Sequence, residues 1–381
     1  MTLSAPMILG VAALAVVAAA CSSASQDAAP APSPTPTATA SATTVPDVAA
    51  ESTPTATVPP VGTPSPAETP TVTPAPAAPI PAADLVITAF PVPPGSRPHD
   101  VAPAPDGGVW YTGQGSGELG WLDPTTGETR QIALGAGSRP HGVIVGPDGA
   151  AWVTDGGLNA IVRVEPATDA VTVYPLPADR PDANLNTATF DGDGLLWFTG
   201  QNGVYGVLDP VDGAMTVFDA PRGTGPYGIA TTPGGEVFYA SLAGSYVGAI
   251  NPDRSVSILE PPTADQGARR VWADSTGAVW VSEWTSGQLS RYTPVTGEWE
   301  SWLLPGEEPQ AYAVYVDDTD IVWVSDFGGN ALHRFDPTTE QFDTFELPHD
   351  PGDVRQILGR PGEVWGAESA ADQLVVVWRG D

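Results

Sequence analysis

The chain has 381 residues, with 45 Asp or Glu, 14 Arg, no Lys and a formal net charge of −31. Because binding to phosphate backbones needs a basic face, this charge argues against a nucleic-acid partner. The single cysteine, Cys21, excludes an internal disulfide framework and a site built from several thiolates.

The first 20 residues have the pattern of an export signal segment. Residues 7–20, MILGVAALAVVAAA, form an apolar run of 14 residues, which fits a signal peptide and is short for a membrane span. Cys21 follows directly, in an order that resembles a bacterial lipobox. We therefore expect lipidation at Cys21 and a cell-surface lipoprotein that touches the membrane only through this anchor. A secreted protein cleaved near Ala20 is the alternative, and both interpretations predict export.

Residues 21–84 consist almost entirely of Ala, Pro, Ser and Thr, as in PAPSPTPTATASATTVP. Such a composition cannot bury enough apolar surface to form a core, and its prolines remove backbone donors. We expect a disordered, extended linker that holds the following domain away from a surface.

Residues 85–381 contain a repeat. An aromatic residue recurs with spacings of 42, 45, 41, 42, 43 and 42 residues, at Trp110, Trp152, Trp197, Phe238, Trp280, Trp323 and Trp365. Each unit carries short β-rich runs joined by turn sequences such as PDG and DPTTGE. A period near 42 with four strands per unit predicts an all-β, seven-bladed β-propeller with one blade per repeat. We expect the repeated rings to pack between blades.

The last repeat, 348–381, contains only three strand-like runs. A fourth run, LVITAFPVP at 85–93, stands before the first repeat. We predict that it becomes the outermost strand of the last blade, because this closes the ring and removes two sheet edges. The domain 85–381 is expected to be monomeric.

Polar side chains recur where the innermost strand of each blade begins and where the second strand ends. Since these strands are antiparallel, both positions should meet at one mouth of the central channel. The first set is His99, His141, Asn186, Tyr227, Arg269 or Arg270, Gln310 and Arg355. The second set contains Asp155, Glu283, Asp326 and Glu368. We expect a small-molecule or peptide ligand there, with Arg139 beside it; a plug of paired charges is the alternative.

Two other histidines have weaker positions. His333 lies on a predicted third strand, where packing is the expected role. His349 lies in the connection before the innermost strand of the last blade, on the same face as the predicted mouth.

The repeats resemble those of the streptogramin B lyase (virginiamycin B lyase) family over 85–381. The resemblance is carried by units such as RPHGV…DGAAWVTD…NAIVRV…VTVYPLP and by VWVSEWTSGQLSRYTP at 279–294. It implies a seven-bladed propeller and a metal-assisted lyase that opens a cyclic depsipeptide by elimination at an ester. It also implies Mg²⁺, or another divalent cation, held by carboxylates beside a histidine base.

Carried onto this sequence, the resemblance implies His99 or His141 as the base. The candidate metal ligands are Asp155, Glu283, Asp326, Glu368 and Glu308. In the sixth repeat Glu308 and Pro309 match the family's glutamate–proline, but Gln310 stands where the family has histidine.

Two other functions fit the sequence. One is a non-enzymatic surface propeller that binds a ligand or partner at the same mouth. The other is a metal-dependent lactonase of the gluconolactonase type, for which Asn186 and Glu283 are the available ligands.

Overall fold

The computed structural model describes residues 78–380, so the predicted signal segment, Cys21 and residues 21–77 of the predicted linker lie outside the described part. The described chain contains one short 3₁₀ helix, η1 (Ala82–Asp84), and 28 strands. These strands form seven four-stranded sheets, as the sequence predicts. Within residues 78–380, no helix is long and apolar enough to cross a membrane.

Each sheet is one blade, and consecutive repeats form consecutive blades. Blade 1 comprises β2 (Pro98–Pro103), β3 (Val109–Gly113), β4 (Glu118–Leu122) and β5 (Thr129–Ala133). Blade 2 comprises β6 (Pro140–Val145), β7 (Ala151–Asp155), β8 (Ala160–Val164) and β9 (Val171–Pro175). Blade 3 comprises β10 (Leu185–Phe190), β11 (Leu196–Gly200), β12 (Val204–Leu208) and β13 (Met215–Asp219). Blade 4 comprises β14 (Pro226–Thr231), β15 (Val237–Ser241), β16 (Tyr246–Ile250) and β17 (Val256–Leu259).

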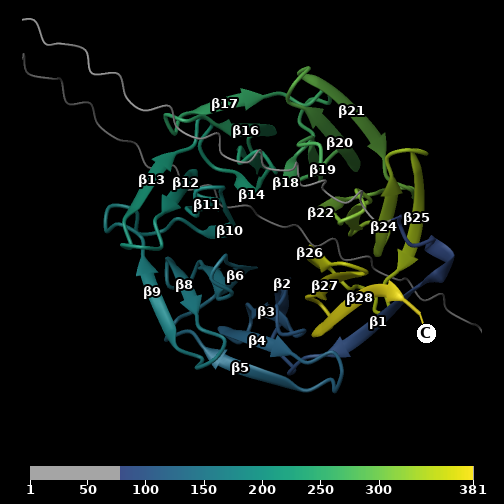
Figure 1. The fold of residues 1–381 in the computed structure, drawn as a ribbon. Coiled ribbons are helices and arrows are strands. Elements are labelled where there is room, and N and C mark those ends of the chain that lie inside the picture. Colours follow the sequence, from purple (N-terminus) through teal and green to yellow (C-terminus); the bar gives the residue numbers. More distant parts are fainter. Residues whose placement is uncertain (1–77, 381) are drawn as a thin grey trace, which may run out of the picture. The chain divides into compact units, whose positions relative to one another are not determined.

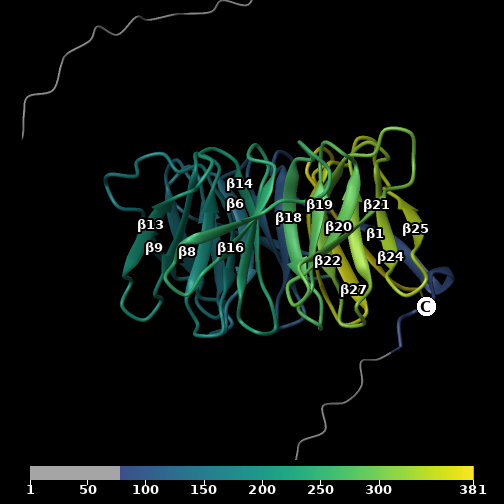
Figure 2. The ribbon, with the colours of Figure 1, turned by 90° about the horizontal axis from the view of Figure 1, so that it is seen from above.

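The remaining blades complete the ring. Blade 5 comprises β18 (Ala268–Ala273), β19 (Val279–Glu283), β20 (Gln288–Thr293) and β21 (Glu298–Leu303). Blade 6 comprises β22 (Ala311–Val316), β23 (Val322–Asp326), β24 (Ala331–Asp336) and β25 (Gln341–Glu346). Blade 7 comprises β26 (Val354–Arg360), β27 (Glu363–Glu368), β28 (Gln373–Arg379) and β1 (Leu85–Pro91). Figure 1 shows the first strand of each blade nearest the centre, and Figure 2 shows the strands running between two loop-bearing faces.

The first strand of the domain pairs with the last. β1 runs antiparallel to β28 from the pair Leu85↔Arg379 to the pair Pro91↔Gln373. The predicted strand 85–93 therefore ends two residues earlier, at Pro91. This pairing supplies the fourth strand of blade 7 from the N-terminal side of the domain, so the outer edge of the blade is β1.

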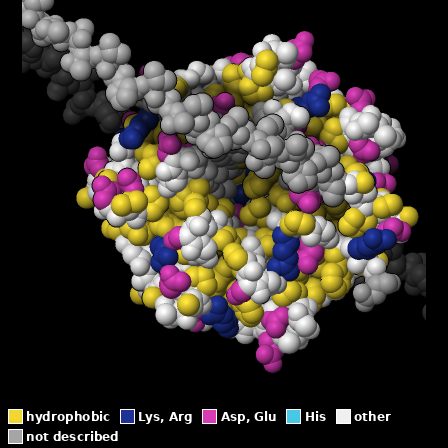
Figure 3. All heavy atoms as spheres, viewed as in Figure 1, with side chains coloured by type: hydrophobic (Ala, Val, Ile, Leu, Met, Phe, Trp, Pro, Cys, Tyr) yellow, Lys and Arg dark blue, Asp and Glu magenta, His cyan; other side chains and the backbone are white. Residues whose placement is uncertain are grey.

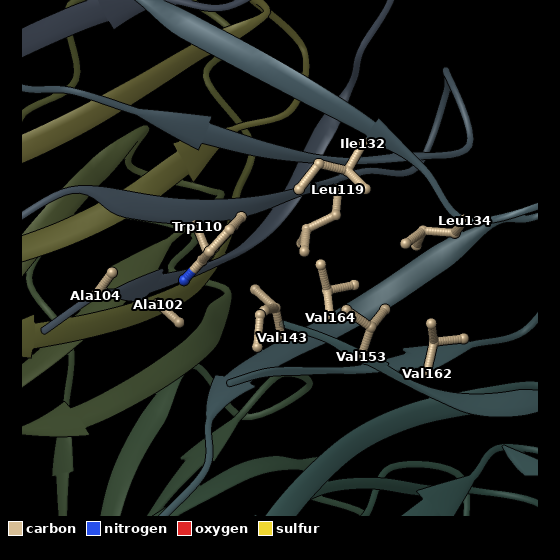
Figure 4. Packing of buried hydrophobic residues seen from close by; sticks show 11 residues of the cluster. Ala102, Ala104, Trp110, Leu119, Ile132, Leu134, Val143, Val153, Val162 and Val164 are labelled. Atoms are coloured by element: carbon tan, nitrogen blue, oxygen red, sulfur yellow. The ribbon is translucent and has the colours of Figure 1, made fainter. Parts of the chain in front are cut away.

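The repeated aromatic rings lie between blades. Trp110 and Leu119 of blade 1 share a buried cluster with Val143 and Val153 of blade 2 (Figure 4). Four of the repeated indoles also donate a hydrogen bond to an aspartate in the hairpin turn before their own strand. These pairs are Trp152–Asp148 (3.1 Å), Trp197–Asp191 (2.7 Å), Trp280–Asp274 (2.9 Å) and Trp323–Asp317 (2.9 Å). The PDG-type turn and the ring are thus one structural unit.

A β-bulge interrupts the start of the innermost strand in every blade. In blade 1, Pro98 is opposite Gly113 and Val101 is opposite Tyr111, so His99 and Asp100 together face the single residue Thr112. Equivalent register shifts occur in the other six blades. Consecutive strand residues normally point to opposite faces, and a bulge changes the direction of a side chain. The bulges therefore direct the side chains of these residues into the channel.

Candidate functional site

Seven side chains, one from each bulge, form a first ring around the channel. They are His99, His141, Asn186, Tyr227, Arg269, Tyr312 and Arg355. Six of these were predicted, and the sixth blade needs a correction. β22 begins at Ala311, opposite Asp326, so Tyr312 takes the ring position assigned to Gln310. Gln310 lies before the strand, and its N–H donates to Asp326 at 2.7 Å.

The residue after each ring position forms a second ring below the first. Its large members are Asp100, Thr187, Arg270 and Gln356, and all four are buried. Arg270 donates to Asp100 Oδ1 at 2.9 Å and to Thr187 Oγ1 at 3.0 Å. Sequence reasoning missed Asp100, Thr187 and Gln356. Alternation along a regular strand would turn them away from the channel, whereas the bulge does not.

A hydroxyl opposite most bulges fixes them in place. Thr112 Oγ1 accepts the N–H of Asp100 at 2.9 Å and donates to the carbonyl of His141 in the next blade at 2.8 Å. Thr154 does the same for Gly142 and Asn186. The signal was present in the sequence, because Thr or Ser stands two residues after the repeated aromatic residue in five of the seven blades.

The two ring histidines are in contact with each other. Their ring centroids are 3.8 Å apart, and both side chains are buried. Burial, followed by the nearby Arg270, Arg355 and Arg269 guanidinium groups, holds the pKa of His99 well below its usual value. Burial and then the neighbouring His99 lower the pKa of His141. Both rings are therefore neutral near pH 7.

The hydrogen bonds assign the protons on these rings. His99 Nδ1 lies 2.7 Å from Asp100 Oδ1. Burial raises the pKa of Asp100, and the Arg270 guanidinium opposes this rise. Because Arg270 cannot lose its proton, its partner Asp100 is the carboxylate acceptor. The N–H of His99 is then on Nδ1, and its Nε2 is a free base, as in an aspartate–histidine pair.

His141 has the complementary arrangement. Asn186 Oδ1 accepts from the Thr187 hydroxyl at 2.8 Å, so the Asn186 amide group points its Nδ2 at His141 Nε2, 3.2 Å away. His141 therefore carries its proton on Nδ1, which is buried without a partner among the described residues. A base at His99 and an N–H donor at His141 are thus adjacent in the first ring.

Asp155 and Glu283, at the ends of their second strands, accept hydrogen bonds from loop residues and, for Glu283, also from the neighbouring strand. Asp155 accepts the N–H groups of Arg139, Gly157 and Leu158, each at 2.9 Å. Glu283 accepts from the hydroxyls of Ser286 and Ser290, each at 2.6 Å. Burial raises the pKa of Glu283. These contacts account for both carboxylates without a channel ligand.

The two weaker histidines contact the other two carboxylates. His333 Nε2 lies 3.2 Å from Asp326 Oδ2, and His349 Nδ1 lies 2.7 Å from Glu368 Oε2. Burial raises the pKa of Asp326, but hydrogen bonds from His333 and from the N–H groups of Gln310 and Gly329 outweigh burial and lower it. The last candidate ligand, Glu308, is exposed and lines a hollow with Trp284 and Gln310. None of the five predicted metal ligands therefore contacts His99 or His141 among the described residues.

Three side chains of the two rings can hold a metal ion. One donor atom each from His99, Asp100 and His141 lies within 4.8 Å of the others. This set has two nitrogens and one oxygen, whereas Mg²⁺ prefers an octahedron of oxygens. Asp100 is also paired with Arg270, and a guanidinium at 2.9 Å repels a cation. The residues present do not fit Mg²⁺; two imidazoles and a carboxylate are more typical zinc ligands.

Two cavities flank the rings. One of about 190 Å³ lies at the mouth and is lined by Arg139, His141, Asp182 and Asn184, among others. The other, of about 390 Å³, lies on the opposite side of the second ring, with Asp100, Thr187, Arg270 and Gln356 beside apolar strand residues. Figure 3 shows hydrophobic side chains along the visible rim of the central hollow.

The pair of ligands considered for a lactonase does not form a shared site. Asn186 contacts His141 and Thr187, whereas Glu283 contacts two serines of its own blade, Ser286 and Ser290. The described residues therefore give no support to this alternative.

Comparisons with known proteins give one family. The model of the virginiamycin B lyase family matches residues 80–296. A search of curated protein sequences gave no significant match. Among solved structures, a streptogramin B lyase is 22% identical, with a TM-score of 0.71 over 77% of this chain and 98% of that chain. A catalytically inactive virginiamycin B lyase from Staphylococcus aureus with quinupristin is 18% identical, with a TM-score of 0.71 over 77% and 99% of the two chains. YCF48 bound to D1 peptide is 14% identical, with a TM-score of 0.61 over 77% and 96%.

Proposed function

The chain belongs to the virginiamycin B lyase family, and we propose that it is a lyase that breaks a carbon–oxygen bond at the first ring of the channel. One observation carries this proposal. The neutral imidazole of His99 is held by Asp100 at 2.7 Å, and Arg270 in turn holds Asp100 at 2.9 Å. This chain of contacts fixes the ring orientation and leaves Nε2 as the only free basic atom of the pair.

The proposed step is an elimination at an ester. His99 Nε2 removes a proton from the carbon next to the carbon that bears the ester oxygen. The electrons of the C–H bond form a carbon–carbon double bond, and the C–O bond breaks to release a carboxylate. The N–H on His141 Nδ1 and the guanidinium of Arg269 are the donors that stabilise the developing negative charge. No water is added in this step.

The electrostatics of the ring suit this role. The lowered pKa of His99 keeps the base unprotonated at neutral pH. The cost is a weaker base, so catalysis depends on stabilising the negative charge of the transition state. Arg269, which is among the guanidinium groups that lower the pKa of His99, supplies part of that stabilisation. The proposal uses neither a metal ion nor the carboxylates that bind the loops.

The experiment is turnover of quinupristin by the full chain, followed by mass spectrometry. Elimination opens the ring without changing the mass, whereas hydrolysis adds one water. We expect opening at unchanged mass, and loss of about a hundredfold or more in rate in His99→Gln. His333→Gln is the matched control and should keep the rate. Unchanged turnover in His99→Gln, or turnover that is abolished by a chelator, would refute the proposal.

A second function is favoured by the size of the cavity beside His141. The cavity beside His141 measures about 190 Å³, which is smaller than the roughly 300–1,000 Å³ typical of small-molecule sites. Such a cavity receives part of a ligand and leaves the rest exposed, as in a binding propeller without turnover. Binding of quinupristin with no change in its mass or ring would favour this function.

We also propose export and lipid anchoring at Cys21, with a monomeric propeller that has no nucleic-acid partner. The lipobox-like order after residues 7–20 supports the anchor, and the net charge of −31 supports the absence of nucleic-acid binding. Cys21→Ala should move the protein from the membrane fraction to the medium. Retention in the membrane fraction would contradict lipidation.

A further inference from the structure

We infer that the mouth beside blades 5, 6 and 7 binds a carboxylate-bearing ligand, with Arg269 as its main anion-binding residue and Trp284 and Phe327 as an aromatic wall. This inference names the ligand class of the site proposed above, and it rests on the proposed function only for the statement that the ligand is turned over.

The first observation concerns the partners of the arginines. Ten of the 14 arginines lie within 4.0 Å of a carboxylate oxygen. The four without such a partner among residues 78–380 are Arg97, Arg139, Arg254 and Arg269, and the first three are exposed to water. Arg269 is thus the one partly buried arginine of the described chain without a carboxylate.

The second observation comes from arginines that stack on aromatic rings in the same protein. Arg130, Arg163, Arg222 and Arg291 each stack on a ring, and each also pairs with an acid of its surroundings. Arg269 stacks on three rings and has no acidic partner within residues 78–380. The chain has 45 acidic residues, yet none of the described ones pairs with Arg269. We therefore expect the carboxylate partner of Arg269 to come from a ligand.

The third observation is the geometry around Arg269. Its guanidinium carbon lies 3.4 Å from the ring centroid of Tyr312 and 4.6 Å from those of Tyr227 and Trp284. One nitrogen lies 3.2 Å from the Tyr227 hydroxyl, and Nε is buried with no hydrogen-bond partner in the part of the chain that the structure describes. Stacking fixes the plane of the guanidinium, and a fixed planar fork is suited to bidentate binding of a carboxylate.

The aromatic cluster continues to a second arginine. Phe327 stacks on Tyr312 with centroids 4.6 Å apart, and Arg355 lies 5.5 Å from the Phe327 centroid. Trp284 meets Phe327 edge-on at 5.4 Å. Trp284 and Phe327 are only partly buried, so they offer apolar surface to a ligand. The ligand class is therefore a carboxylate next to an aromatic or other apolar group.

The positive charge here is strong enough to act on its neighbours. Burial raises the pKa of Tyr312, but Arg269, Arg270 and Arg355 outweigh burial and lower it. The net charge of −31 opposes the approach of anions. That distant field is screened beyond roughly 8 Å at physiological ionic strength, whereas contact with Arg269 is not.

The test uses benzoate as the probe and benzamide, its neutral counterpart, as the reference ligand. Calorimetric titration of the full chain should give tighter binding of benzoate than of benzamide. Arg269→Gln should weaken benzoate binding by about tenfold or more and leave benzamide binding unchanged. Arg269→Lys keeps the charge without the planar fork and should give an intermediate value. Arg222→Gln removes a stacked arginine that already has an acid partner and is the matched control.

Equal binding of benzoate and benzamide would overturn the inference, and so would benzoate binding that Arg269→Gln leaves unchanged. An equal loss in Arg222→Gln would overturn it too, because the effect would then come from net charge. The lyase proposal fails separately, if quinupristin is not opened while benzoate still binds.

Discussion

His99 and His141 stand 42 positions apart in the chain, yet their rings lie with centroids 3.8 Å apart in the channel. Each lies in the bulge directly after the first residue of the innermost strand of its blade, and adjacent blades bring these bulges together. The contact places one base next to one donor in a region that water scarcely reaches. It also means that protonation of either ring places a charge beside its neighbour.

The histidine pair should make the free energy of unfolding depend on pH. The pKa values of both histidines in the folded protein lie below the ordinary value of 6.5. The unfolded chain therefore binds protons at pH values where the folded chain does not. The free energy of unfolding should be unaffected by these histidines above about pH 6.5 and should fall as the pH decreases, by up to about 1.4 kcal/mol per pH unit for each histidine. Urea unfolding at several pH values measures this slope.

The variant His141→Gln should reduce that slope between pH 6.5 and the folded pKa. His349→Gln removes a partly exposed histidine and is its control. A slope that is the same in the wild type and in His141→Gln would show that the pair does not resist protonation.

The buried pair Asp100–Arg270 should be coupled. Both side chains are at most 5% exposed. Removing one partner leaves the other charge buried, so Asp100→Asn and Arg270→Gln should each cost about 3–5 kcal/mol of unfolding free energy. The double variant should cost clearly less than the sum of the two. Additive losses in a double-mutant cycle measured by urea unfolding would contradict the pairing.

The hydroxyl opposite a bulge should contribute to stability through two hydrogen bonds. Thr154→Val keeps the shape but leaves the N–H of Gly142 and the carbonyl of Asn186 without this partner. We expect a loss of about 1–3 kcal/mol in unfolding free energy. Thr172→Val, on an exposed strand position, should change stability by less than about 0.5 kcal/mol. Equal effects of the two substitutions would show that the Thr154 hydroxyl does not stabilise the bulge.

The fold could be predicted from the sequence because the same pattern of aromatic residues and turns occurs seven times. The spacing of the aromatic residues predicts the seven blades, and the run at 85–93 predicts the strand that completes blade 7. The register predicted for blade 6 is wrong by two residues, because the ring position belongs to Tyr312 and not to Gln310. Gln310 follows a proline, as His99 does, but the pairing of Ala311 with Asp326 sets the register.

The site was less accessible to sequence reasoning, for two physical reasons. A bulge breaks the alternation of side chains, so the neighbours Asp100 and Arg270 join the channel although an ideal strand would hide one residue of each adjacent pair. Carboxylates at strand ends such as Asp155 also accept hydrogen bonds from neighbouring loops, because the loop N–H groups beside them need acceptors. Residue type and position indicate that a carboxylate is near the mouth, but not which way it points.

Removal of β1 should destabilise the ring. A chain that starts at residue 92 leaves the edge of β28 unpaired and uncovers Phe90's partner Trp365, whose ring lies 5.6 Å away. We expect a lower thermal midpoint and concentration-dependent association through the free edge. A chain that starts at residue 78 keeps β1 and is the control. Equal midpoints for the two truncated chains would show that β1 does not stabilise the ring.

The chemistry of the channel is tested most directly by NMR titration of the imidazole groups, since the chain has only four histidines. We predict that the two signals lost in His99→Gln and His141→Gln do not titrate near pH 6.5, because both pKa values are lowered, and that added Mg²⁺ does not move them. Titration of these two signals near pH 6.5, or their shift with Mg²⁺, would contradict a neutral, metal-free base at His99.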